Sequence, residues 1–396
     1  MAADIVERAQ AIQARLQELR RTFHAHPEPS RGEFETAKRV KRELEDIGGY
    51  AIRSGVGGCG LLADLDSGRP GPKLALRADM DALQVKEDTG LPCSSLNEGV
   101  MHACGHDNHI TMLLGAARLL QDLNREGKLR GSVRLIFQPA EELSPHGGSR
   151  YMIAAGALDD VDAVFGLHVW PELPLGQVGV KAGPLMAASD HFSVHMEGMT
   201  SHAAKPQEGV DAVLAGAQYV SALQSIVSRN ADPTKPIVIT VGKFNAGTRY
   251  NIVAGSCDLE GTCRTFDPEI RDLAERRLDE VLQGVCQLSG CKGKLNYERG
   301  YMAVVNNAKM AGYAADTVRK LFGQEAAAEV KPAMTAEDFS FYLAEKPGAF
   351  LWIGTTAEGE EIWPLHSCHY SPNEGVLWRG AALLTELVLD FKDSAG

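Results

Sequence analysis

The stretch SVRLIFQPAEELSPHGGSRYMIAAGALDDVDAVFGLHV, residues 132–169, contains the pattern that decides the fold. The apolar runs at its two ends, SVRLIFQ and AVFGLHV, predict buried strands, and a helix is expected between them near 147–156. Upstream, GLLADL and KLALRAD predict two more strands, followed by a helix that is expected to start after Asp107 as its N-cap and to end near Asn124. Strands that alternate with helices predict an α/β domain with a mostly parallel central sheet, whose chemistry lies at the strand ends.

The pattern changes after about residue 186. Strands are expected at DHFSVHMEG, PIVITVGKF, SCDLEGTCR and near 293–298, with helices over 208–229 and 267–287. A strand–helix–strand–strand–helix–strand order is the ferredoxin-like α+β arrangement. The α/β pattern returns from GYMAVVNN onward. We therefore predict a catalytic domain formed by 1–185 and 299–396, which also begins with helices over 4–23 and 35–47, and an inserted ferredoxin-like domain over 186–298.

Composition excludes several classes of function. The chain has 396 residues and a net charge of −12, without a basic block, which argues against binding to nucleic acid. Its longest apolar runs fall short of the roughly 20 residues that a membrane span needs. The acidic start MAADIVERAQ does not resemble a secretory signal, and eight scattered cysteines are expected to be reduced thiols. We expect a cytoplasmic protein that binds neither nucleic acid nor a membrane.

The stretch MHACGHDNHI, residues 101–110, is unusually rich in metal-binding side chains. Cys104 and His106 flank one glycine where a strand gives way to a helix, and in extended backbone residues two apart share a face. A thiolate and an imidazole suit a divalent transition metal. Taken alone, such a pair is more often a buried thiol beside a hydrogen-bonded histidine than a metal site.

Other candidate groups occur at further strand ends. Glu141 and Glu142 follow an apolar strand directly, and adjacent carboxylates repel each other unless a cation or a proton holds them. His168 ends the strand of GLHVWP, and PLHSCHY near the C-terminus supplies His366. The meeting of such groups at strand ends of one domain predicts a metal centre.

With these motifs the chain resembles the M20 metallopeptidase and amidohydrolase family, most closely its aminoacylase-like N-acyl-amino-acid hydrolases of the hippurate and auxin-conjugate type. The likeness covers nearly the whole chain. The segments that carry it are HAHPEPS, LRADMDALQVKEDTGLPCSSLNEGVMHACGHDNH, VRLIFQPAEE, GLHVWPELPLGQVGVKAGPLMAASDHF, SHAAKP, GTCRTF, MTAEDFSFYL and LHSCHYSPNE. The resemblance implies a phosphorylase/hydrolase-like catalytic domain and two divalent metal ions per subunit.

The resemblance also implies roles for the site residues. Cys104 would bridge the two ions, Glu142 and His366 would complete one ion, and His106 and His168 the other. Glu141 would be the general base rather than a ligand. Asp79 would orient a ligand, whereas Arg77 stands where other branches carry a metal-binding histidine, for which His106 compensates. Zinc or manganese is expected, and cobalt or nickel would also suit the ligands.

The inserted domain is expected to act as a lid and to form a homodimer or homotetramer. By resemblance, His202 would stabilise the tetrahedral oxyanion, in many relatives from a dimer partner. Asn251 and Arg264 match positions that line the substrate pocket, although Ala254 stands where the family usually has proline. His109 is expected to pack in the first turn of its helix or to orient a ligand.

We therefore predict a metal-dependent amidohydrolase that cleaves the amide of a small N-acyl amino acid or short peptide, with Glu141 as general base. A dipeptidase or carboxypeptidase would use the same metals and base. A different class of enzyme would use Cys104 as a covalent nucleophile with His106 as its base and no metal. A non-catalytic binding module on a hydrolase fold is a third alternative, although this chain keeps every expected ligand.

Overall fold

The computed structural model describes residues 2–391 and divides them into two compact units. Unit 1 takes the chain up to Leu185, Val305–Lys331 and the residues from Asp338 on, and unit 2 takes Met186–Val304 and Pro332–Glu337. We predicted that the catalytic domain resumes at residue 299, but this residue lies inside strand β11 (Lys292–Tyr301) of unit 2. The chain re-enters unit 1 at Val305. The short segment Pro332–Glu337 joins unit 2 because the Ala187 N–H donates to the carbonyls of Ala333 and Thr335, at 3.2 and 2.9 Å.

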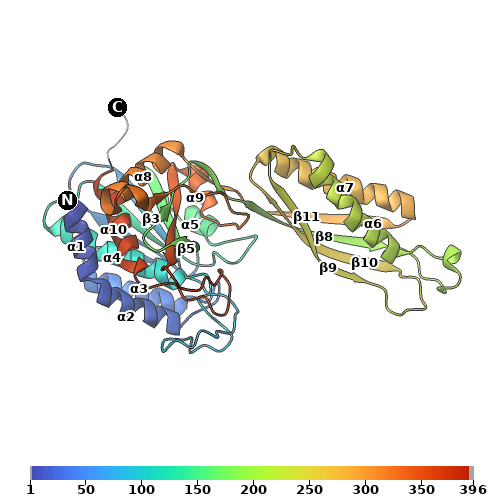
Figure 1. The fold of residues 1–396 in the computed structure, drawn as a ribbon, viewed down its shortest axis with the longest axis horizontal. Helices are drawn as coiled ribbons and strands as arrows, with labels where there is room; N and C mark the ends of the chain where they lie inside the picture. Colours follow the sequence, from blue (N-terminus) through green and yellow to red (C-terminus); the bar gives the residue numbers. More distant parts are fainter. Residues whose placement is uncertain (1, 392–396) are drawn as a thin grey trace. The chain divides into compact units, whose positions relative to one another are not determined.

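Unit 1 is built on an eight-stranded sheet, which confirms the predicted α/β class (Figure 1). Four strands in its middle, in spatial order β4, β3, β5 and β14, are parallel. Strands β1 and β2 extend one edge antiparallel, and β6 and β13 extend the other. In chain order the strands are Ala51–Val56 (β1), Gly60–Asp66 (β2), Lys73–Asp79 (β3), Ser132–Gln138 (β4), Ala163–Pro174 (β5), Val178–Gly179 (β6), Ala327–Ala328 (β13) and Gly348–Thr356 (β14).

Helix α4 (His106–Arg125) is the central helix of unit 1. Nearly every residue of α4 is buried, because the helix packs between strands β3 and β5 and the helices around it (Figure 1). Those neighbours are α2 (Gln13–Ala25), α3 (Phe34–Ile47) and α10 (Val376–Leu389). The remaining helices of the unit are Ala2–Ala11 (α1), Ser149–Ala154 (α5), Ala308–Phe322 (α8), Gln324–Ala326 (η3) and Ser340–Glu345 (α9).

The predicted helix over 4–23 is wrong in one respect, because the chain breaks it at Ile12 into α1 and α2. Both halves contact α4 and α10, but α1 packs mainly on α10 and also reaches α8, whereas α2 packs mainly on α4. The described residues contain no helix with the length and apolarity that a membrane crossing requires.

Unit 2 has the predicted ferredoxin-like order. Its antiparallel sheet runs β11–β8–β10–β9, with β8 at Ala188–Glu197, β9 at Ile237–Ala246 and β10 at Ser256–Thr265. Helices α6 (Ala212–Ser225) and α7 (Pro268–Ser289) pack on it and enclose a separate apolar core.

The helix expected over 208–229 is divided. A short 3-10 turn (η1, Pro206–Glu208) comes first, and α6 starts after Asp211, which caps the amides of Val213 and Leu214. A π-helical turn, Ile226–Asn230 (η2), ends the segment. Two short strands, β7 (Gly183–Met186) and β12 (Val304–Asn306), pair with each other where the chain passes between the units.

Candidate metal centre

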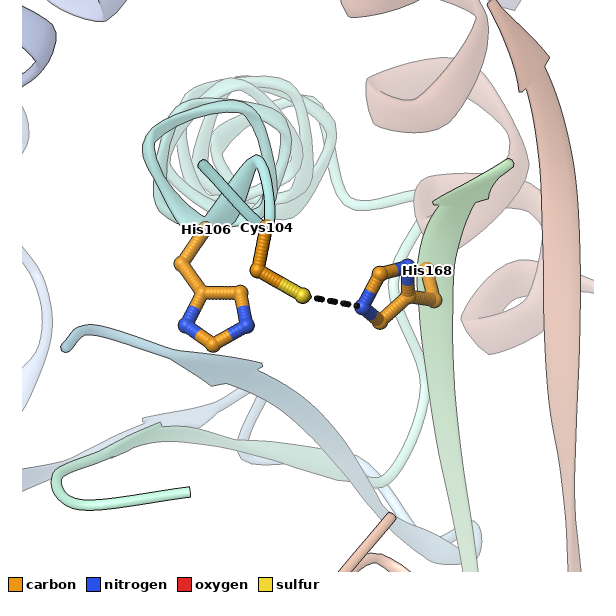
Figure 2. A group of neighbouring side chains, drawn as sticks. All are labelled: Cys104, His106 and His168. Carbon is orange, nitrogen blue, oxygen red and sulfur yellow. Dashed lines mark hydrogen bonds between the residues drawn. The ribbon is translucent and has the colours of Figure 1, made fainter. Parts of the chain in front are cut away.

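Three buried side chains meet beside the middle of strand β5, at the start of helix α4. In Figure 2, Cys104 lies in the turn just before α4, His106 at the first position of α4 and His168 on β5. The prediction that His168 ends its strand is wrong, because β5 continues to Pro174. The Cys104 Sγ lies 3.4 Å from the His168 Nε2, and one ligand atom of each of the three residues lies within 4.8 Å of the others. The structure thus brings together a thiol and two imidazoles that are separated by up to 64 positions in the chain.

Gly105 produces the convergence of Cys104 and His106. Its backbone is left-handed, with φ 86° and ψ 19°, and a Cβ atom there would lie 2.5 Å from the Val169 Cγ2. We expected extended backbone at this point, and that expectation is wrong, because His106 is already the first residue of α4. A left-handed turn that only glycine adopts freely places the two side chains on the same side.

Asp107 is not the N-cap of α4, in contrast to the sequence prediction. Gly105 occupies the N-cap position and forms no side-chain cap. The buried Asp107 carboxylate instead contacts the Arg20 Nε at 2.8 Å and the His24 Nδ1 at 2.9 Å. A buried cation competes more strongly for a carboxylate than backbone amides do.

Both imidazoles direct their Nε2 atoms to the cluster. The His106 Nδ1 donates to the Asp81 carbonyl at 2.8 Å, and its buried Nε2 has no hydrogen-bond partner among the described residues, so a cation that displaces the proton of this nitrogen would find a lone pair there. The His168 Nδ1 donates to the Val169 carbonyl at 2.6 Å, which leaves its Nε2 facing Cys104. A histidine whose Nδ1–H is bound to a carbonyl and whose Nε2 is free has the tautomer of a metal ligand. The donor set therefore fits a divalent cation.

The electrostatics of this cluster favour a cation as well. Burial lowers the pKa of His106, but the carboxylates of Asp79 and Asp81 outweigh it and raise the pKa to about 10. Burial lowers the pKa of His168 well below its ordinary value. Burial also raises the pKa of the Cys104 thiol well above its ordinary value, and the carboxylates of Glu142 and Glu141 raise it further. The excess negative charge around these groups calls for a positive ion.

A second group shares Cys104 with the first. Ligand atoms of Cys104, Glu142 and His366 lie within 4.8 Å of one another, and the Glu142 Oε1 is 3.2 Å from the His366 Nε2. Glu141 joins His106 and Glu142 in a third group of the same size. His366 is a non-glycine residue in the left-handed region, with φ 68°. Such strained residues persist where the surroundings impose them, often at functional sites.

Asp79 is anchored beside these groups by two neighbours. Its Oδ2 accepts from the Arg77 Nη1 at 2.7 Å, and its Oδ1 accepts from the His109 Nδ1 at 2.6 Å. The same Oδ2 lies 3.7 Å from the His106 Nε2. His106 and His109 lower the pKa of Asp79 well below its ordinary value, although burial opposes them. Asp79 is thus an anion in contact with a candidate ligand.

Asp81 is a site residue that the sequence interpretation missed. Its carboxylate accepts the backbone N–H groups of Glu141 at 3.1 Å and Glu142 at 3.0 Å, and its carbonyl holds His106. The available signal was the period of two in RADMD, which places Asp81 two residues after Asp79 at the end of β3. One residue therefore connects the paired glutamates to the histidine cluster.

The geometry does not favour a cysteine nucleophile. The imidazole in contact with the Cys104 thiol belongs to His168, and the Nδ1 of His106 is occupied by the Asp81 carbonyl. A thiol whose pKa is raised by burial and carboxylates lacks the thiolate character that nucleophilic catalysis needs.

The remaining candidates lie in unit 2. His202 is exposed, and its Nδ1 accepts the Ala204 N–H at 3.0 Å, so its Nε2 carries a proton to donate. Asn251 lies beside it, because the Ala203 N–H donates to the Asn251 carbonyl at 3.2 Å. Arg264 lies on β10, half-buried, with hydrogen bonds to the Thr262 hydroxyl and the Cys263 carbonyl. Of the predicted substrate-binding side chains in unit 2, His202 thus offers an imidazole donor and Arg264 a guanidinium.

Comparisons with known proteins agree with this arrangement. Residues 75–390 match the family described as peptidase family M20/M25/M40. An N-acetyl-L-cysteine deacetylase of Bacillus subtilis is 39% identical over 376 residues, which cover 95% of this chain and 88% of that protein. An N-acyl-L-amino acid amidohydrolase of Geobacillus stearothermophilus is 41% identical over 287 residues, 72% of this chain and 76% of that one.

A solved structure agrees over the whole fold. The crystal structure of a dinuclear metal-binding peptidase of the M20 family from Bacillus subtilis has a TM-score of 0.83 and 34% sequence identity, covering 96% of this chain and 98% of that one. Fold, ligand cluster and sequence matches agree, and the chain belongs to the M20/M25/M40 peptidase family.

Proposed function

We propose that this chain is a metal-dependent amidohydrolase that cleaves the amide of N-acyl amino acids, with Glu141 as general base. The observation that carries the proposal is that Cys104 belongs to two overlapping groups of ligand atoms, with the carboxylate of Glu141 beside them. The names of its relatives, an N-acetyl-L-cysteine deacetylase and an N-acyl-L-amino acid amidohydrolase, support the choice of substrate.

Cys104, His106 and His168 would hold one cation, and Cys104, Glu142 and His366 the other. When bound, a pair of divalent cations supplies Lewis acidity that polarises an amide carbonyl and lowers the pKa of water. The thiolate favours zinc, and the nitrogen and oxygen ligands also accept manganese, cobalt or nickel. We propose zinc or manganese as the native ions.

Glu141 is the residue placed to move protons. Its side chain is 5% exposed, and its Oε1 lies 3.4 Å from the backbone N–H of Asp338, which limits its orientations. Its carboxylate takes the proton of the attacking water and later delivers it to the leaving amine nitrogen. Glu142, its neighbour, would be a metal ligand. One of the two adjacent carboxylates would therefore bind a cation, and the other would transfer protons.

Residues of unit 2 would bind the substrate. The Nε2–H of His202 would donate to the oxyanion of the tetrahedral intermediate. The guanidinium of Arg264 suits the substrate carboxylate, and the side chain of Asn251 supplies further hydrogen bonds. We propose that this unit serves as the lid and the dimerisation domain of a cytoplasmic homodimer or homotetramer. The edge strand β9, with Val238 and Phe244 exposed by 37% and 41%, supports a contact between sheet edges.

A second candidate is a dipeptidase or carboxypeptidase, which the description of the structural neighbour as a peptidase supports. A panel of N-acetyl- and N-benzoyl-amino acids and free dipeptides separates the two activities. We expect the acyl amino acids to be hydrolysed faster, and faster turnover of dipeptides would overturn the assignment.

Metal dependence is tested separately. Chelator treatment should abolish turnover, and added divalent ions should restore it. Full activity of chelated protein that elemental analysis finds free of metal would contradict the proposal.

A further inference from the structure

The loop that carries the paired glutamates is held by two buried carboxylates from elsewhere in unit 1. Three successive amides take part. The Ala140 N–H donates to the Glu33 Oε1 at 2.7 Å, and the N–H groups of Glu141 and Glu142 donate to the two carboxylate oxygens of Asp81 at 3.1 and 3.0 Å. Consecutive amides that face one side form an anion-binding concavity. Here the anions are side chains of the protein itself.

Ala140 needs such support. Its φ is 57°, in the left-handed region that a residue with a Cβ atom rarely adopts. The peptide between Ala140 and Glu141 determines the direction in which the Glu141 side chain leaves the backbone. An acceptor for the Ala140 N–H therefore stabilises the conformation that aims Glu141.

Glu33 supplies that acceptor, although burial of its carboxyl group is unfavourable. Its side chain is fully buried, and it belongs to none of the ligand groups among the described residues. Burial, and then the nearby charge of Asp81, raises the pKa of Glu33 to about 7. A buried carboxyl group is unfavourable unless its hydrogen bonds compensate.

Capping of helix α3 does not explain why the carboxyl group of Glu33 is buried. Glu33 occupies the N-cap position, but its side chain makes no capping hydrogen bond. Glu28 does this instead, since its carboxylate accepts the N–H groups of Glu35 at 3.2 Å and Thr36 at 2.7 Å. Ser30, in the same segment, donates to the Asp81 Oδ2 at 2.6 Å. Glu28 thus holds the first amides of helix α3, whereas Glu33 holds the Ala140 amide of the loop.

We propose that Glu33 is a positioning residue, which fixes the left-handed turn at Ala140 and so sets the direction of the general base Glu141. The consequence for catalysis rests on the proposed function, but the contact between Glu33 and the loop does not. Glu33 belongs to none of the groups of candidate metal ligands among the described residues, and it would act through the Ala140 amide.

The test combines hydrogen exchange with kinetics on the full-length protein. In Glu33→Ala the Ala140 amide, followed by mass spectrometry of a peptide spanning 138–143, should exchange at least about tenfold faster because its acceptor is gone. The kcat for N-acetyl amino acids should fall about 10- to 100-fold with little change in KM, because the base is misdirected while the substrate pocket is intact. Glu33→Gln should keep both values within about threefold, since its amide oxygen still accepts the hydrogen bond.

Glu28→Ala is the matched control from the same segment. It should speed exchange at the start of α3 only, with kcat unchanged. Wild-type exchange and kcat in folded Glu33→Ala, or an equal effect of Glu28→Ala on the loop, would overturn the proposal. If Glu33→Ala does not fold, Glu33→Asp, which withdraws the acceptor by one methylene, should give the same pattern. If the wild type turns over no acyl amino acid, the proposed function fails, and the exchange measurement still decides the role of Glu33.

Discussion

His109 and Asp79 form a buried pair behind the histidine cluster, with the His109 Nδ1 2.6 Å from the Asp79 Oδ1. The other ring nitrogen of His109, Nε2, accepts the Val169 N–H at 2.9 Å, so the tautomer of His109 is determined. Val169 directly follows His168 on β5. One imidazole therefore links the anion beside His106 to the strand that carries His168.

This link predicts that His109→Ala weakens metal binding without removing a ligand. Loss of the anchors on Asp79 and Val169 should lower the affinity for divalent ions about 10- to 100-fold, as for other residues that orient ligands. Competition of the metal-free protein with a chromogenic chelator measures this affinity. His195→Ala, on the exposed surface of unit 2, is the control, and a metal affinity of His109→Ala equal to that of the control would refute the link.

Replacement of the general base predicts a separation of binding from turnover. Glu141→Gln should keep the metal content of the wild type, because the groups around Cys104 remain, and its kcat should fall at least about 100-fold. Steady-state kinetics and elemental analysis of the same preparation check both statements. Unchanged turnover in a fully metallated sample would show that another group takes the proton.

Gly105→Ala should be strongly destabilising. The left-handed backbone and the contact of 2.5 Å between the new Cβ and Val169 both oppose an alanine. We expect a loss of about 2–5 kcal/mol in the free energy of unfolding, the sum of the left-handed penalty and overpacking. Gly99→Ala is the matched control, since Gly99 has φ 78° but no atom within 4 Å of a Cβ, and should lose about 1–2 kcal/mol. Equal losses in urea unfolding would mean that Val169 moves aside.

The buried carboxyl group of Glu33 predicts a pH-dependent stability. Its pKa is raised from 4.5 to about 7, so the folded state binds more protons than the unfolded state between these values, and stability falls as the pH rises through them. Glu33→Gln has no such proton to lose. Relative to the wild type, it should gain up to about 3 kcal/mol in the free energy of unfolding between pH 4.5 and 7.5. Urea unfolding in matched buffers measures the difference, and a constant difference across this range would contradict the raised pKa.

The fold class and the convergence of most candidate ligands could be predicted from the sequence. Alternating strands and helices, and the later strand–helix–strand–strand–helix–strand order, are patterns of local apolar periodicity, which burial of each element's apolar face imposes directly. Cys104 and Glu142 stand next to apolar runs and His168 lies within one, and parallel strands bring such residues to one edge of a sheet. Local pattern and topology were therefore enough to predict that they come together.

The residues that support the site could not be predicted from the sequence, because they depend on tertiary contacts. Asp107 was expected to cap α4 but binds Arg20 instead, and the amides of residues 140–142 are held by Asp81 and Glu33, which precede them by tens of residues. No local pattern distinguishes these carboxylates from solvated ones. Their partners are determined by which buried cations and amides come within hydrogen-bonding distance after folding, and burial makes those hydrogen bonds decisive because water is not available to replace them.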